Sequence, residues 1–296
     1  MTDSLRTRVR ACRSFLLTPG SRPEGFPAAR AAGGDAIIVD LESTVAVGDK
    51  GRARETMLAF LREAPDADFV RIIRINSPRS VDGLRDLLAL RESGNYPDAV
   101  VIPRCESADE VRLVADVLDG SKSTVGIVPM VELARAVFVA HLMADAHERV
   151  CGLFLGGGDL AADLGVEGSW ENLLYARSRV VAAAATTGIA AIDVPYFKAD
   201  REGFGHEATS SRKLGMTGKA ALRPEQLAVI NGIFTPSSDA VTRARSIMAA
   251  GISNGASAAV LNGRVVEPAM VREAKRVLAI AAKLHDGAAA GRALPG

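Results

Sequence analysis

Eight short apolar runs recur along the chain at spacings of about 25 to 35 residues, and each is followed by a longer segment with helical periodicity. The runs cover residues 14–17, 36–39, 70–75, 99–102, 125–128, 150–155, 189–192 and 219–222. Between them we expect helices over residues 49–63, 81–92, 107–118, 133–144, 170–186 and 202–214. Eight parallel strand–helix units in about 250 residues are typical of a (β/α)₈ barrel. A doubly wound Rossmann sheet is the competing α/β fold, but no GxGxxG turn follows the first run. The sequence therefore predicts a TIM barrel.

Beyond the eighth run, the chain is too long for a single closing helix. We predict a barrel domain over residues 1–224, a C-terminal helical extension over 225–285 that could act as a lid, and a disordered Gly-rich tail over 286–296. Within the extension, the dipeptide Asn262-Gly263 favours a type I′ hairpin turn. This extension could cover a barrel mouth, either its own or that of a neighbouring subunit.

The composition excludes several classes of partner. With 36 Lys and Arg against 35 Asp and Glu, the formal net charge is +1, so nucleic acid is not expected as a ligand. No apolar stretch reaches the roughly 18 to 20 residues of a membrane helix. The apolar run before Thr18 is too short for the apolar region of a signal peptide, so we do not expect one. The three cysteines form no CxxC pair, which argues against a disulfide framework or a zinc knuckle. We expect a cytoplasmic protein without a membrane or nucleic-acid partner.

Charged side chains follow almost every apolar run, at the barrel end where active sites lie. Glu132 and Asp159 come just after the fifth and sixth runs, so their carboxylates can converge. Two carboxylates with room for water suit Mg²⁺. The alternative is that each acid caps a helix or forms a salt bridge at the rim. None of the four histidines stands near a strand end, so zinc is not expected.

Arg74 ends the third run and is the candidate for binding a carboxylate. A guanidinium beside a divalent cation can grip the carboxylate of a 2-oxo acid while the cation takes the neighbouring carbonyl. The alternative is an ordinary ion pair with Asp40 or Glu42. We expect only one of these two acids, which follow the second run, to point into the mouth. The glycines of 156–158 are interpreted as backbone slack at a strand end.

A series of motifs resembles the citrate lyase beta-subunit-like family, which includes malyl-CoA and citramalyl-CoA lyases. The resemblance covers residues 13–278 and is carried by RSFLLTPGSRPEGF, GGDAIIVDLEST, RIN, AVVIPRCESADEV, VPMVELARAV, GLFLGGGDLAADLG and GMTGKAALRPEQLAVIN, followed by FTPS. These segments occur in family order and at family spacing. The family has a (β/α)₈ barrel with a C-terminal helical extension and assembles as trimers or hexamers, so the resemblance implies a homotrimer or hexamer here.

The same resemblance assigns roles to individual residues. It implies that Glu132 and Asp159 bind Mg²⁺, that Arg74 holds the carboxylate of the oxo acid, and that Glu42 acts beside the waters of the metal. Arg13, at the start of the first run, is a further candidate for contacting substrate. The implied reaction is the reversible cleavage of a 3-hydroxyacyl-CoA, such as malyl-, citramalyl- or citryl-CoA, into an acyl-CoA and a 2-oxo acid or related carbonyl compound.

The sequence departs from the family pattern at several functional positions. In the malyl-CoA branch an aspartate from the neighbouring subunit's extension assists, and Glu267 stands at that position here. Ser43 and Gly158 each stand where the family has an acidic residue, and Arg223 stands where it has a histidine. These departures keep two other functions open, a thioesterase that hydrolyses the same kind of thioester and a catalytically silent subunit of a lyase complex.

Overall fold

A computed structural model describes residues 2–119, 125–253, 260–261 and 264–289. The chain forms two compact units, Met1–Ile233 and Phe234–Gly296. Within the described residues no helix is long and apolar enough to cross a bilayer.

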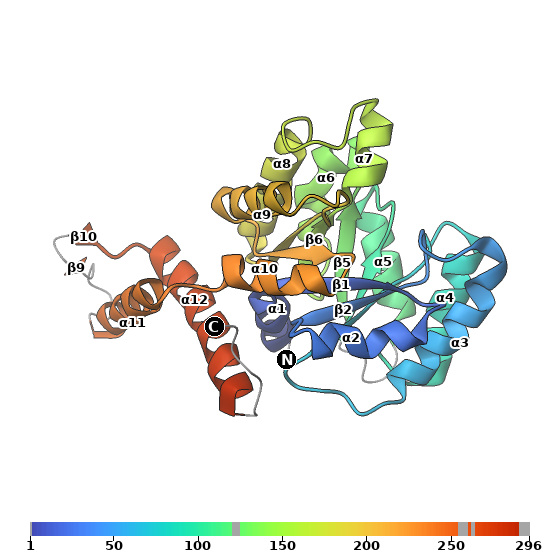
Figure 1. Cartoon of the computed structure of the whole chain (residues 1–296), viewed down its shortest axis with the longest axis horizontal. Coiled ribbons are helices and arrows are strands. Elements are labelled where there is room, and N and C mark those ends of the chain that lie inside the picture. The colour runs from blue at the N-terminus through green and yellow to red at the C-terminus, as the bar shows by residue number, and fades with distance from the viewer. Residues whose placement is uncertain (1, 120–124, 254–259, 262–263, 290–296) are drawn as a thin grey trace. The chain divides into compact units, whose positions relative to one another are not determined.

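The first unit is built on a closed barrel of eight parallel strands that follow one another in chain order (Figure 1). The strands are β1 (Ser14–Pro19), β2 (Ala36–Asp40), β3 (Val70–Arg74), β4 (Ala99–Ile102), β5 (Gly126–Val131), β6 (Gly152–Leu155), β7 (Ala190–Asp193) and β8 (Gly218–Ala221). Parallel pairing of β1 with β8 closes the barrel. Each predicted apolar run overlaps one strand, so the predicted TIM barrel is confirmed.

Helices surround the barrel, as alternating strands and helices in a parallel sheet require. They are α1 (Thr2–Ala11), α2 (Phe26–Ala31), α3 (Lys50–Leu61), α4 (Val81–Ser93), α5 (Ala108–Val117), α6 (Ala134–Ala144), α7 (Gly157–Leu164), α8 (Leu174–Thr187), α9 (Arg201–Leu214) and α10 (Glu225–Phe234), with 3₁₀ turns at Pro23–Gly25 and Val47–Asp49. Ser80 and Ser107 cap α4 and α5 by accepting backbone N–H groups. These caps fix where the chain leaves the strand ends and enters the helices.

The barrel interior is filled by apolar side chains from all eight strands. Among them are Phe15, Ile38, Ile72, Val101, Met130, Phe154, Ile192 and Ala220, all buried in one cluster. Phe15 and Phe154 are the two aromatic members of this cluster, and the other members are smaller aliphatic or sulfur-containing residues. A filled interior leaves the carboxyl ends of the strands as the place where polar groups can gather.

The boundary of the barrel unit lies further along the chain than the predicted position after residue 224. The helix α10 belongs to the barrel, because its Leu227 and Ile230 are fully buried. The Asn231 side chain accepts a hydrogen bond from Ser14 Oγ at 2.8 Å and donates one to the Gly33 carbonyl at 2.8 Å. These contacts tie α10 to the start of β1, so it is the eighth barrel helix and not part of the extension.

The second unit consists of α11 (Ser238–Ser253), β9 (Val260–Leu261), β10 (Arg264–Val265) and α12 (Pro268–Ala289). The strands β9 and β10 pair antiparallel, as expected for the predicted hairpin, while its turn at residues 262–263 lies outside the described residues. The two helices pack through a buried cluster of Ala244, Ile247, Ala274 and Val277. The helix α12 extends to Ala289, past the predicted start of the tail at residue 286. Residues 290–296 of that predicted tail lie outside the described residues.

Candidate active site

Arg74 and Asp40 form a buried ion pair at the carboxyl ends of β3 and β2. The guanidinium Nε donates to Asp40 Oδ1 at 2.6 Å, and Nη2 donates to Asp40 Oδ2 at 2.8 Å. Burial alone would raise the pKa of Asp40, but the charge and hydrogen bonds of Arg74 lower it below its ordinary value. Burial alone would lower the pKa of Arg74, and the charge of Asp40 raises it above its ordinary value. Both groups are therefore charged, and Arg74 is held in one orientation.

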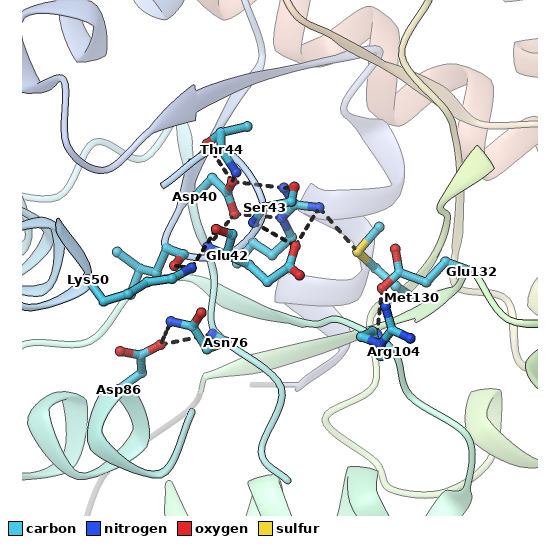
Figure 2. A network of polar contacts seen from close by, with 12 residues as sticks. Asp40, Glu42, Ser43, Thr44, Lys50, Asn76, Asp86, Arg104, Met130 and Glu132 are labelled. Atoms are coloured by element: carbon cyan, nitrogen blue, oxygen red, sulfur yellow. Dashed lines mark hydrogen bonds and ion pairs between the residues drawn. The ribbon is translucent and has the colours of Figure 1, made fainter. Parts of the chain in front are cut away.

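The chain turns sharply after Asp40 and brings Glu42 back toward the same guanidinium. Glu42 N–H donates to Asp40 Oδ1 at 2.9 Å, and Lys50 Nζ donates to the carbonyls of Leu41 and Glu42 at 2.7 and 2.6 Å (Figure 2). Glu42 Oε2 lies 3.4 Å from Arg74 Nη1. The prediction that only one of Asp40 and Glu42 points into the mouth was wrong, because both carboxylates pair with Arg74. Residues two apart along an extended chain share a face, so the pattern itself places them on the same side.

Ser43, one of the departures from the family pattern, lies inside this cluster. Its Oγ accepts a hydrogen bond from Arg74 Nη2 at 2.6 Å. Asp40 and Ser43 together occupy Nε and Nη2, so the Nη1 edge of the guanidinium is the part that faces Glu42 and the sulfur of Met130. A ligand carboxylate would approach Arg74 from that edge.

Asn76, next but one to Arg74, has a structural role that sequence reasoning did not identify. Its backbone N–H and its Nδ2 both donate to Asp86 Oδ2, at 2.8 and 2.7 Å. The other carboxyl oxygen of Asp86 accepts from Arg54 Nε at 2.7 Å. Burial is the largest influence on Asp86 and raises its pKa. This arrangement fixes the turn that follows β3 and therefore the end of the strand that carries Arg74.

Glu132 directly follows β5 and is buried, with 2% of its surface exposed. Its Oε1 accepts the backbone N–H of Arg104 at 2.5 Å, as Figure 2 shows beside Met130. Burial raises the pKa of Glu132 to about 7; the charges of Asp159 and Glu42 also raise it, while Arg104 N–H and Arg74 oppose the shift. Glu132 is thus a desolvated carboxyl group with acidic neighbours, an environment that a cation would stabilise.

Asp159 is the third residue of α7, which begins immediately after β6. Its side chain is about half exposed, and Oδ2 lies 4.0 Å from Arg104 Nη1. The glycines before it are not backbone slack, as the sequence suggested, because Gly157 and Gly158 form the first turn of α7. A Cβ on Gly156 would lie 2.4 Å from Glu132 Cβ, so this position must be glycine for Glu132 to fit. The triplet therefore positions both carboxylates.

The pKa shifts connect four of the predicted site residues, because Arg74, Glu42 and Asp159 all influence Glu132. Among the described residues, no group of three or more His, Cys, Asp or Glu side chains could hold a metal ion. A site made by Glu132 and Asp159 is smaller than such a group. It suits Mg²⁺, which keeps several waters and takes only one or two protein carboxylates.

Arg13 lies elsewhere, and its prediction as a substrate contact is corrected. It precedes β1 at the amino end of the barrel, whereas Arg74, Glu132 and Asp159 lie at the carboxyl ends of strands. Its Nε and Nη2 donate to the two carboxyl oxygens of Asp35 at 2.8 and 3.0 Å. The motif at the start of the first strand thus forms a structural ion pair beneath the barrel.

Glu267 and Arg223 are two further positions at which the sequence departs from the family pattern. Glu267 belongs to the second unit, where its carbonyl accepts the N–H groups of Met270 and Val271 at the start of α12. Its predicted catalytic role stays a prediction. Arg223, which follows β8, donates from Nη2 to the Lys198 carbonyl at 3.2 Å.

Sequence comparison places this geometry among known enzymes. The model of the HpcH/HpaI aldolase/citrate lyase family matches residues 13–224. The chain is 32% identical over 300 residues to L-malyl-CoA/beta-methylmalyl-CoA lyase of Rhodobacter capsulatus. This alignment covers 91% of this chain and 94% of that protein. It is 31% identical over 290 residues to citrate lyase subunit beta of Escherichia coli strain K12, with 92% and 93% covered.

Solved structures agree with these relatives. CitE of Mycobacterium tuberculosis, in complex with magnesium, acetoacetate and coenzyme A, superposes with a TM-score of 0.70 at 29% identity, covering 92% of this chain and 99% of that chain. RipC of Yersinia pestis gives a TM-score of 0.69 at 32% identity, covering 78% and 98%. The resemblance seen in the motifs is confirmed. Since the matching segment runs through all eight strands of the barrel, the chain belongs to the HpcH/HpaI aldolase/citrate lyase family.

Proposed function

We propose that this chain is a Mg²⁺-dependent carbon–carbon lyase that cleaves or forms a 3-hydroxyacyl-CoA such as malyl-, citramalyl- or citryl-CoA. The observation that carries the proposal is the buried Glu132 carboxyl group, whose pKa is raised to about 7 by burial, with the carboxylate of Asp159 also raising it. Relatives named malyl-CoA lyase and citrate lyase subunit beta, and a structural neighbour with magnesium and coenzyme A, support it.

Glu132 and Asp159 are the residues that would hold the cation. Both present carboxylate oxygens, the ligands that Mg²⁺ prefers, and Glu132 has a single protein hydrogen-bond donor within the described residues. Bound there, Mg²⁺ would supply Lewis-acid stabilisation of negative charge on the substrate carbonyl oxygen. Arg104 N–H and the absence of a side chain at Gly156 keep the Glu132 carboxyl group in place.

Arg74 would orient the substrate through a carboxylate. Asp40 and Ser43 already accept hydrogen bonds from Nε and Nη2, so the guanidinium is held in one orientation before substrate binds. A carboxylate of the oxo acid would bind along the Nη1 edge. Glu42 Oε2 lies 3.4 Å from Nη1. There it would accept a hydrogen bond from a water molecule or from the hydroxyl group of the substrate.

Glu267 would act from the second unit, on the thioester side of the reaction. A carboxylate there can take a proton from the carbon beside the thioester in the condensing direction and return it in the cleaving direction. We also infer a homotrimer or hexamer, in which Glu267 serves either the barrel of its own chain or that of a neighbour.

Product analysis tests the proposal. Purified protein with Mg²⁺ is incubated with malyl-CoA, methylmalyl-CoA, citramalyl-CoA and citryl-CoA in separate reactions, and the products are separated by liquid chromatography. The proposal predicts acetyl-CoA or propionyl-CoA together with a 2-oxo acid. Free CoA with an intact hydroxy acid would instead assign a thioesterase. A protein that cleaves none of these thioesters, and that binds neither Mg²⁺ nor oxaloacetate, would be a silent subunit.

A further inference from the structure

Arg104 has an unusual backbone conformation at the edge of the candidate metal site. Its φ is +50°, and within the described residues it is the one non-glycine residue with a positive φ. This left-handed region is unfavourable for any residue with a Cβ atom and persists only where surrounding contacts hold it. Such strain at the end of β4, next to Glu132, points to a functional constraint on Arg104.

Contacts on both sides of the Arg104 peptide hold this conformation, and one of them is with the site. Arg104 N–H donates to Glu132 Oε1 at 2.5 Å. The Arg104 carbonyl accepts from Arg79 Nη2 at 2.7 Å, and Arg79 Nη1 donates to Glu106 Oε1 at 2.7 Å. The strained backbone therefore aims one N–H group at the buried carboxyl group that is proposed to bind Mg²⁺.

The side chain of the same residue reaches the other carboxylate. Arg104 Nη1 lies 4.0 Å from Asp159 Oδ2, and both side chains are about half exposed. A long ion pair between exposed groups is weak and easily exchanged. Glu106, two residues further along the chain, already pairs with Arg79 and Arg135, at 2.7 and 3.7 Å.

We propose that Arg104 is a specificity-determining residue, whose guanidinium balances Asp159 in the metal-free protein and binds an anionic group of the substrate once Mg²⁺ has neutralised that carboxylate. This inference rests on the proposed function, because it needs the cation at Glu132 and Asp159. The ligand group is a second carboxylate on the oxo acid or a phosphate of the thioester carrier. Both match the planar, two-pronged donor pattern of a guanidinium.

Three variants of the full chain separate the backbone role from the side-chain role. Arg104→Gly keeps the N–H to Glu132 and tolerates the positive φ, but it removes the guanidinium. Arg104→Lys keeps the positive charge but lacks the two coplanar N–H donors of the guanidinium. Arg135→Gly is the matched control, because Arg135 is a more exposed arginine of the same rim that pairs only with Glu106 among the described contacts.

Calorimetric titration with MgCl₂ alone is the first measurement. Removing the positive charge beside Asp159 should tighten Mg²⁺ binding by Arg104→Gly roughly fivefold. Arg104→Lys and Arg135→Gly should bind Mg²⁺ as the wild type does. Weaker or unchanged Mg²⁺ binding by Arg104→Gly, with an unchanged melting temperature, would overturn the proposed balance with Asp159.

Titration at saturating Mg²⁺ is the second measurement, with oxaloacetate, pyruvate and coenzyme A as separate probes. Oxaloacetate carries one carboxylate more than pyruvate. If Arg104 binds that group, Arg104→Gly lowers the preference for oxaloacetate roughly tenfold, and pyruvate binding hardly changes. A similar loss confined to coenzyme A identifies the phosphate as the anion.

The outcomes distinguish this inference from the proposed function. Wild-type protein that binds no Mg²⁺ overturns both. Wild-type protein that binds Mg²⁺, with Arg104→Gly keeping its affinity for all three probes, overturns the role of Arg104 alone. An equal loss in Arg135→Gly would show a general effect of rim charge and would also overturn it.

Discussion

Gly156 and Glu132 fit together so closely that a Cβ on Gly156 would lie 2.4 Å from Glu132 Cβ and 2.5 Å from its Oε2. The carboxyl group that follows β5 can thus occupy its place only because the residue that follows β6 lacks a side chain. Gly158, two residues further, has open space where its Cβ would be. Gly156 and Gly158 therefore allow two Gly→Ala substitutions in one segment to be compared directly.

Gly156→Ala should displace the Glu132 carboxyl group and weaken Mg²⁺ binding. We expect a loss of about 1–3 kcal/mol in the free energy of unfolding, since overpacking must shift Glu132 or the backbone. Gly158→Ala should leave Mg²⁺ binding unchanged and stability unchanged or slightly raised, because alanine favours helix. Urea unfolding and calorimetry measure both. Equal effects of the two substitutions would show that close packing at Gly156 is unimportant.

Asp40→Asn should destabilise the barrel by leaving the buried guanidinium of Arg74 without a charged partner. The expected loss is about 3–5 kcal/mol in the free energy of unfolding. The control is Asp49→Asn, which breaks an exposed pair with Arg52 and should change stability by less than about 1 kcal/mol. Urea unfolding measures the free energy of unfolding of both variants. A loss no larger in Asp40→Asn than in Asp49→Asn would contradict a stabilising Asp40–Arg74 pair.

Mg²⁺ binding should release a proton below pH 7. The pKa of Glu132 is raised to about 7 in the metal-free protein, so most Glu132 side chains are protonated at pH 6 and most are ionised at pH 8. The cation binds the ionised form, hence binding at pH 6 should release about 0.9 proton per ion and binding at pH 8 about 0.1. Calorimetry in buffers with different ionisation enthalpies measures this number. Release that is equal at both pH values would rule out Glu132 as the source.

The barrel and its polar rim could be predicted because they depend on local patterns. Eight apolar runs predict eight strands, and parallel strands bring Arg74, Glu132 and Asp159 to the same end. Arg13 could not be assigned correctly by the same reasoning. Its motif adjoins β1 at the opposite end, and only the ion pair with Asp35 reveals its structural role.

Other features depend on contacts between distant segments. The placement of α10 follows from Asn231 meeting Ser14, more than 200 residues away in the chain. The shared contact of Asp40 and Glu42 with Arg74 depends on the position of β3 beside β2, more than 30 residues further along the chain. The left-handed backbone of Arg104 arises from its partners Glu132 and Arg79, and no local signal marks it.

Calorimetric titration of Mg²⁺ into the wild type, Glu132→Gln and Asp159→Asn tests the central claim most directly, with the exposed Glu171→Gln as control. Losing a metal ligand should cost more than the roughly 10- to 100-fold typical of losing a ligand's supporting partner. We therefore predict at least a hundredfold weaker binding in Glu132→Gln and Asp159→Asn and wild-type binding in Glu171→Gln. The same Mg²⁺ affinity in all four proteins would contradict a cation site formed by Glu132 and Asp159.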